Sequence, residues 1–238
     1  MRSLVVLRVA VGLCAAAASL GSTFAQSYPH AFPREGVVKL HETERLILWQ
    51  VNWVNGVAQP VHRHQYDMAS IYMRWGAVRV TPLNGKAGPV GGPFPAPSPY
   101  FQRKGVTHTE EGVGGPADPA RAAITVDLKD GVTVPPFVVK PGAIAAFPRV
   151  GATAVLNNER VVIWEYIWQP KRAVPMHVHD KDSVEVFVEP GIILSKSEDG
   201  KEESYSVAFN TARFVPRGVV HSEEATSGSP KAFVIELK

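Results

Sequence analysis

The stretch Pro60-Val-His62-Arg-His64 returns 115 residues later as Pro175-Met-His177-Val-His179. A lone histidine follows each pair, His108 after the first and His221 after the second, and these two lie 113 residues apart. Six of the eight histidines in the 238-residue chain therefore form two equivalent triplets. Because imidazole is the commonest metal ligand, this repeat predicts two similar metal sites on two similar domains.

The repeat extends well beyond the histidines. The matching positions are 44–49 with 159–164, Trp53 with Trp168, Asp67 with Asp182, Gly76 with Gly191, 101–111 with 214–224, and 122–129 with 231–238. A unit of about 110 residues is a duplicated domain, because solenoid repeats are much shorter. We therefore expect one domain over residues 26–130 and a second over residues 131–238.

Within each copy the pattern is typical of β-structure. Residues 46–53 and 161–168 are rich in β-branched and aromatic side chains, and Gly, Pro, Asn and Asp separate such runs. Asp199-Gly200 predicts a hairpin between residues 192–197 and 204–209. The matching stretch 85–99 is dense in Pro and Gly, and proline donates no hydrogen bond to a ladder. It is expected to be a loop, either over a barrel mouth, across a subunit contact, or disordered.

The first 25 residues predict a cleaved signal peptide, which makes the protein periplasmic or secreted. Arg2 and Arg8 precede an apolar stretch over 9–20, and Thr23-Phe24-Ala25 offers small residues at the cleavage positions. An uncleaved anchor is the alternative, but the apolar run is short for a span of about 20 residues. Cleavage before Gln26 removes Cys14, the one cysteine, so thiolate ligands and a cysteine nucleophile are excluded.

Charge and composition restrict the partners. The formal net charge is only +3, and no basic cluster is interleaved with aromatic residues. Nucleic acid is therefore not expected as a partner, and neither is a membrane once the signal peptide is removed. We expect a small-molecule ligand or substrate.

The histidine spacing is suited to metal binding in a β-protein. Residues i and i+2 of a strand point to the same face, so His62 and His64 project together, as do His177 and His179. One further histidine from a distant strand completes a set of three nitrogens. Such a set leaves coordination positions open for water, oxygen or substrate, as in catalytic metal sites.

These motifs resemble those of the cupins in a two-domain (bicupin) arrangement. The first cupin motif is Gly, five residues, His-x-His and, further on, Gly; copy one has it from Gly56 to Gly76, and copy two has Lys171 in place of the first glycine. The second motif, Pro-x-Gly-x-x-His, is complete in copy two from Pro216, whereas copy one has Arg103 in place of the proline. The resemblance implies two tandem jelly-roll β-barrels, and a homodimer through edge strands is compatible with it.

The resemblance also implies a metal held by three histidines and a glutamate of the first motif, and here the chain departs from the family. Four and five positions after the second histidine stand Met68 and Ala69 in copy one, and Ser183 and Val184 in copy two. No carboxylate occupies either place. Some cupins with three histidines are iron dioxygenases, so the departure leaves catalysis open.

Three glutamates are candidates to replace the missing one. Glu185 shares strand parity with the second His-x-His pair, and its counterpart in copy one is Ser70. Glu110 and Glu223 lie two residues beyond the third histidine of each copy and should face the interior with it. Each could be a fourth ligand, a partner of a ligand or a general base, or could face solvent.

Structural roles are expected for the other notable residues. They are core packing for Trp49, Trp53, Trp164 and Trp168, salt bridges or anchoring of an anion for Arg45 and Arg160, turns for Asp67 and Asp182, and surface positions for His30 and His41.

Three functions are compatible with this sequence. The first is an exported metal-dependent oxygenase or isomerase, with Fe, Mn, Zn, Ni or Cu on the histidines acting on a small organic substrate. The second is a non-catalytic bicupin that binds a metal or small ligand. The third is a structural bicupin with degenerate sites, and the retention of all six histidines counts against it.

Overall fold

The computed structural model describes residues 27–135 and 137–238. Its regular structure there consists of fifteen β-strands and no helix, which confirms the all-β prediction. A helix able to cross a membrane is accordingly not found in the described part of the chain. The expected signal peptide over residues 1–25, with Cys14, lies outside the described residues.

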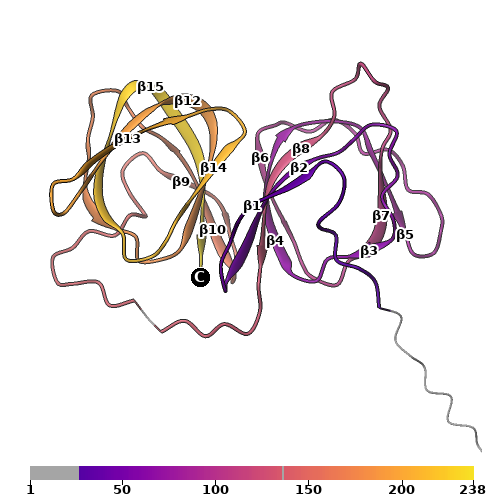
Figure 1. Cartoon of the computed structure of the whole chain (residues 1–238), viewed down its shortest axis with the longest axis horizontal. Helices are drawn as coiled ribbons and strands as arrows, with labels where there is room; N and C mark the ends of the chain where they lie inside the picture. Colours follow the sequence, from indigo (N-terminus) through magenta and orange to yellow (C-terminus); the bar gives the residue numbers. More distant parts are fainter. Residues whose placement is uncertain (1–26, 136) are drawn as a thin grey trace, which may run out of the picture.

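The strands form two barrels that lie side by side, called barrel one and barrel two below (Figure 1). Barrel one contains β1 (Val37–Glu42), β2 (Leu46–Asn52), β3 (His62–Arg63), β4 (Asp67–Arg74), β5 (Val78–Pro82), β6 (Ser98–Gln102), β7 (Thr107–Gly112) and β8 (Ala122–Leu128). Barrel two contains β9 (Thr153–Asn157), β10 (Val161–Ile167), β11 (Val174–Val178), β12 (Ser183–Ser197), β13 (Glu202–Val207), β14 (Thr211–Val215) and β15 (Val220–Leu237).

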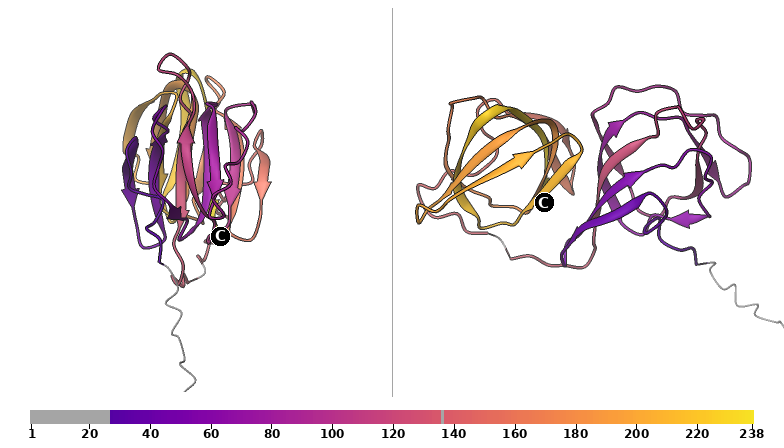
Figure 2. Two further views of the ribbon diagram at one scale, coloured as in Figure 1. Left: turned by 90° about the vertical axis from the view of Figure 1, so that its right-hand side faces the viewer. Right: turned by 45° about the horizontal axis from the view of Figure 1, so that its top comes forward.

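Both barrels have a jelly-roll arrangement, as predicted, although the strands of barrel two are joined in one continuous sheet. In barrel one a five-stranded sheet, β1-β2-β8-β4-β6, faces a three-stranded sheet, β3-β7-β5. In barrel two the 15-residue β12 and the 18-residue β15 are continuous where barrel one has two strands each. Figure 2 shows the barrels from two further directions.

The duplicated stretches differ most in one connection. Barrel two has the predicted hairpin, in which β12 pairs with β13 and Lys196 lies opposite Glu202. Barrel one has no strand between β5 and β6, as the proline-rich composition predicts. The last two residues of the predicted loop, Ser98 and Pro99, instead pair with β4 as the start of β6.

A shared apolar core and a reciprocal pair of salt bridges join the barrels. The core includes Leu48, Ile71 and Ile124 of barrel one and Ile163, Val186 and Ile235 of barrel two. Arg45 donates to Asp182 at 2.7 Å, and Arg160 donates to Asp67 at 3.0 Å. The arginines therefore link barrels rather than positions on one strand, and the aspartates are buried rather than ordinary turn residues.

We predict that Gly76→Ala and Gly191→Ala each destabilise the fold by about 1–3 kcal/mol, the usual effect of overpacking. A Cβ added at Gly76 would lie 2.6 Å from the carbonyl oxygen of Pro119, and one at Gly191 would lie 2.6 Å from that of Ser227. Urea unfolding measures the effect. Gly92→Ala is the control, because an added Cβ meets nothing within 4 Å there, and equal stability of all three variants would contradict the prediction.

Candidate metal centre

Cross-strand pairing brings the first and third histidine of each triplet together. In barrel one His62 on β3 lies directly opposite His108 on β7, and in barrel two His177 on β11 lies directly opposite His221 on β15. Residues opposite each other in an antiparallel pair have neighbouring side chains. The remaining histidine of each triplet comes two residues after the first and therefore projects from the same side.

A glycine turn positions the second histidine of each triplet. Gly105 and Gly218 have φ angles of 94° and 90°, a left-handed conformation that glycine adopts without strain. The amide of Gly105 donates to the carbonyl of His64 and that of Gly218 to the carbonyl of His179, both at 2.7 Å. The glycine of the second motif therefore holds the second histidine beside the strand that carries the third.

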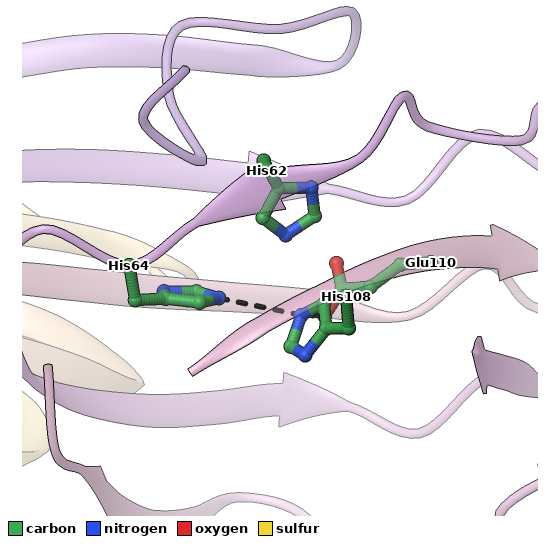
Figure 3. Close-up of side chains that lie close together, drawn as sticks. All are labelled: His62, His64, His108 and Glu110. Carbon is green, nitrogen blue, oxygen red and sulfur yellow. Dashed lines mark hydrogen bonds and ion pairs between the residues drawn. The ribbon is translucent and has the colours of Figure 1, made fainter. Parts of the chain in front are cut away.

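All six predicted histidines gather into two nearly identical clusters, shown for barrel one in Figure 3. The first cluster is His62, His64 and His108, with ring centroids 5.3, 4.8 and 5.2 Å apart. The second cluster is His177, His179 and His221, with centroids 5.3, 4.7 and 5.1 Å apart. One potential ligand atom from each histidine lies within 4.8 Å of those of its cluster.

Hydrogen bonds orient the lone pairs of two histidines inward. The Nδ1 of His62 lies 3.0 Å from the carbonyl oxygen of Pro60, and the Nδ1 of His177 lies 2.8 Å from that of Pro175. Because a carbonyl only accepts, Nδ1 carries the proton in both rings and Nε2 keeps its lone pair. Both Nε2 atoms are buried without a hydrogen-bond partner among the described residues, as metal ligands are before a cation is bound.

The other two nitrogens of each cluster face each other. His64 Nε2 lies 3.4 Å from His108 Nε2, and His179 Nε2 lies 3.1 Å from His221 Nε2. Two imidazole nitrogens that both carry lone pairs repel at this separation unless a proton or a cation lies between them.

Burial keeps four of the six rings neutral. Desolvation lowers the pKa of His62 and His221 to about 4, and that of His64 and His179 to about 3. Neutral imidazole is the form that binds metal, so the donor set fits a divalent cation in either barrel.

A carboxylate joins the first cluster alone. Glu110 Oε1 lies 3.4 Å from His108 Nε2, while its Oε2 accepts from Arg34 at 2.7 Å and from Trp53 Nε1 at 2.9 Å. Burial alone would raise the pKa of Glu110, but the hydrogen bond from His108 and the Arg34 guanidinium hold it well below its usual range. Glu110 is therefore ionised, with one oxygen turned toward the histidines.

The equivalent glutamate of barrel two, Glu223, is engaged elsewhere. Its Oε2 accepts from Arg149 at 3.3 Å and Trp168 at 3.1 Å, and its Oε1 accepts from Arg213 at 3.3 Å and Tyr205 at 3.1 Å. It lies 3.9 Å from His221 Nε2. Both oxygens are already satisfied, which leaves the second cluster with histidine ligands only.

Glu185, the third candidate, does not join the second cluster. It is completely buried and bonds to Arg213 at 2.9 Å. Burial beside Glu223 raises its pKa. Of the three glutamates considered from the sequence, Glu110 is the one placed to take over from the missing motif glutamate.

Two functional residues were not predicted, although the repeat contains their signal. Ala31-Phe-Pro-Arg34 recurs 115 residues later as Ala146-Phe-Pro-Arg149, the same interval as between the His-x-His pairs. Each arginine bonds to the glutamate beside its own cluster. A segment outside the cupin motifs therefore completes the surroundings of both clusters.

The duplicated tryptophans are bound to buried carboxylates as well as packed in the core. Trp49 donates to Asp127 at 2.8 Å, as Trp164 does to Glu236. His30, expected at the surface, also bonds to Asp127 at 2.8 Å, and its side chain is only 13% exposed. That expectation was wrong, because a lone histidine gives no sequence signal of a distant carboxylate partner.

Comparison with known proteins identifies the fold. No family model and no curated protein matches the chain. Among solved structures it is similar to AerE from Microcystis aeruginosa, with 11% identity over 89% of this chain and 99% of that one and a TM-score of 0.58. A cupin 2 conserved barrel domain protein from Leptotrichia buccalis has 10% identity, coverage of 85% and 88%, and a TM-score of 0.53.

A third similar structure is oxalate decarboxylase from Bacillus subtilis, studied for its Mn(II) centres. It has 12% identity over 85% of this chain and 72% of that one, with a TM-score of 0.52. These likenesses show the fold: two tandem barrels of the kind found in cupin structures. Histidine groups that could hold a divalent metal lie in both barrels of the chain.

We predict that the metal-free protein loses stability as the pH falls below about 6.5. The histidine pKa values are lower in the folded than in the unfolded chain, so the unfolded chain binds protons first and is favoured increasingly toward pH 4. The urea midpoint, measured with chelator, should be lower at about pH 5 than at about pH 7.5. His41→Asn, at an exposed site, should leave the drop unchanged; a flat midpoint would contradict the assignment.

Proposed function

We propose that the protein is an exported, metal-dependent bicupin in which each histidine cluster binds one divalent transition metal and barrel one carries the reactive centre. The observation that carries the proposal is the convergence of three buried imidazoles in each barrel, with unpartnered Nε2 atoms on His62 and His177. A buried group without a partner is costly, and a cation satisfies all three nitrogens at once.

Barrel one is the better candidate for catalysis because hydrogen bonds hold its carboxylate ligand in position. His62, His64, His108 and Glu110 would hold the metal, while Arg34 and Trp53 fix the Glu110 carboxylate. A bound metal supplies a Lewis acid that activates an oxygen-bearing substrate or water. Oxygenase or isomerase chemistry on a small organic molecule is compatible with four protein ligands and open coordination positions.

Barrel two favours a second candidate function, binding without catalysis. Its glutamate, Glu223, already accepts four hydrogen bonds, so no carboxylate is available as a base or as a fourth ligand. The second cluster would hold its metal through neutral ligands alone, and more weakly than the first.

The first metal to test is Mn(II), because the similar oxalate decarboxylase from Bacillus subtilis is described by its Mn(II) centres. Fe, Zn, Ni and Cu are the alternatives, since imidazole and carboxylate together bind all of them. Export is proposed on the sequence of residues 1–25. N-terminal sequencing of protein recovered from a periplasmic extract should begin at Gln26, and a chain that keeps residues 1–25 would contradict export by this route.

We predict that the purified protein, prepared without an affinity metal and reconstituted with Mn(II), contains about two equivalents of metal. The double variant His62→Ala/His64→Ala and its counterpart His177→Ala/His179→Ala should each retain about one equivalent. Elemental analysis measures this, with His41→Ala as the control. A wild-type protein that takes up no metal from any of the five candidates would refute the proposed function.

We also predict that equivalent glutamate substitutions have different effects. Glu110→Gln should weaken metal binding in barrel one by about 10–100-fold, because it removes the carboxylate that faces the histidines. Glu223→Gln should chiefly lower stability, because Arg149 and Arg213 lose their buried partner. Metal titration and urea unfolding of both variants separate the two effects. Equal losses of affinity would contradict the assigned roles.

A further inference from the structure

In barrel two the Nδ1 atoms of all three clustered histidines have hydrogen-bond partners. A proline carbonyl accepts from Nδ1 of His177. The Nδ1 atom of His179 lies 3.2 Å from the hydroxyl of Ser183, and that of His221 lies 2.9 Å from the hydroxyl of Ser195. Nδ1 is therefore occupied in each ring, and Nε2 is the nitrogen left for a metal.

Both serines come from one long strand. Ser183 is the first residue of β12, is fully buried and bonds to His179, which follows β11. Ser195 lies near the other end of β12 and bonds to His221 on β15. The carbonyl oxygen of Val215, 3.5 Å from the Ser183 hydroxyl, accepts its hydrogen and leaves its lone pairs for His179. A single strand therefore holds two histidines that belong to different parts of the chain.

Barrel one has no serine at either place. Met68 stands where barrel two has Ser183, and Val80 stands where it has Ser195, each 115 residues earlier in the chain. The strand register agrees, because Val80 and Ser195 each lie opposite the glutamate beside their own cluster. A valine side chain has no polar atom, and a thioether is only a weak acceptor. Accordingly, Nδ1 of His64 is buried without a hydrogen-bond partner among the residues that the structure describes.

The single proton of a neutral imidazole decides which nitrogen can bind a metal. A ring bound through Nε2 carries its proton on Nδ1, and a buried N–H group needs an acceptor. Ser183 and Ser195 supply that acceptor for His179 and His221. Without a metal, the 3.1 Å contact between the Nε2 atoms of these two rings needs a proton on one of them. Because the hydroxyl of Ser195 donates as well as accepts, it fits His221 in either form.

We propose that Ser183 and Ser195 are positioning residues of barrel two. They keep the Nδ1–H groups of His179 and His221 hydrogen-bonded, so that both Nε2 lone pairs meet one divalent metal without a change in ring orientation. In barrel two this support takes the place of the carboxylate that Glu110 offers in barrel one. The role toward a metal rests on the proposed function, whereas the hydrogen bonds themselves are present in the metal-free chain.

Measurements on the second cluster alone test this role. The double variant His62→Ala/His64→Ala, called the parent below, removes the first cluster. Its affinity for Zn(II) is measured by competition with a chelator. In this background Ser183→Ala and Ser195→Ala should each weaken Zn(II) binding by about 10–100-fold, the usual effect of removing a hydrogen-bond partner from a metal-bound histidine.

Two further variants separate the hydroxyl from other effects of substitution. Ser195→Thr keeps the hydroxyl and should bind Zn(II) like the parent. Ser206→Ala, at an exposed place on β13 of the same barrel, is the matched control and should also bind like the parent. The urea midpoint of each metal-free variant shows that it is folded.

Proton–nitrogen correlation spectra of the histidine rings give a second readout, which a merely structural role would not change. Zn(II) is suited to it because the ion is diamagnetic. In the Zn(II)-loaded parent, His177, His179 and His221 should each carry a proton on Nδ1. Ser183→Ala should shift the Nδ1 proton signal of His179 alone, and Ser195→Ala that of His221 alone, because each ring loses its acceptor.

The outcomes separate this proposal from the metal function. A parent that binds one Zn(II), with affinity and Nδ1 proton signals unchanged in both alanine variants, would overturn the positioning role and leave the metal function intact. Zn(II) bound through Nδ1 of His179 or His221 would also overturn it. A wild-type protein that takes up none of the five candidate metals would refute the proposed function and this role together.

Discussion

Three buried imidazoles that face one another are the constraint around which each barrel is arranged. The Nε2 atoms of His64 and His108 lie 3.4 Å apart in barrel one, and those of His179 and His221 lie 3.1 Å apart in barrel two. Burial keeps His64 and His179 neutral. Such a cluster is stable only where strand register, the left-handed glycine turn and the proline carbonyls all hold the rings in place. A divalent cation among the rings would be coordinated by these nitrogens, and metal binding therefore explains why the rings converge.

The two barrels share this histidine arrangement but differ in the carboxylates around it. Both barrels keep an arginine from an Ala-Phe-Pro-Arg segment against a buried glutamate, and both keep tryptophan donors to that glutamate. Barrel two adds Glu185 and Arg213, which fill its interior and occupy Glu223. Barrel one has Ser70 and an open space instead, so its glutamate can face the histidines. In barrel one the glutamate therefore faces the histidines, whereas in barrel two the side chains of Arg149 and Arg213 engage it.

The sequence was sufficient for the fold and for the membership of the clusters, because both depend on periodic or repeated local signals. Matching strands, the Asp199-Gly200 hairpin and the convergence of the histidines all follow from alternation and spacing. The choice among Glu110, Glu185 and Glu223 could not be made, since it depends on arginines that lie far away in the chain. Arg34, for example, is 76 residues from Glu110. The salt bridge between Arg45 of barrel one and Asp182 of barrel two could not be predicted either, because a sequence repeat does not reveal how its two copies pack.

The most direct test of this account is an anomalous difference map, recorded near the manganese absorption edge, from crystals of the Mn(II)-reconstituted protein. The account predicts one peak among the three Nε2 atoms of each cluster, with Glu110 at a bonding distance of about 2 Å in barrel one and Glu223 away from the metal in barrel two. A map without peaks in the clusters, or with Glu223 bound to the metal in the same way as Glu110, would contradict it.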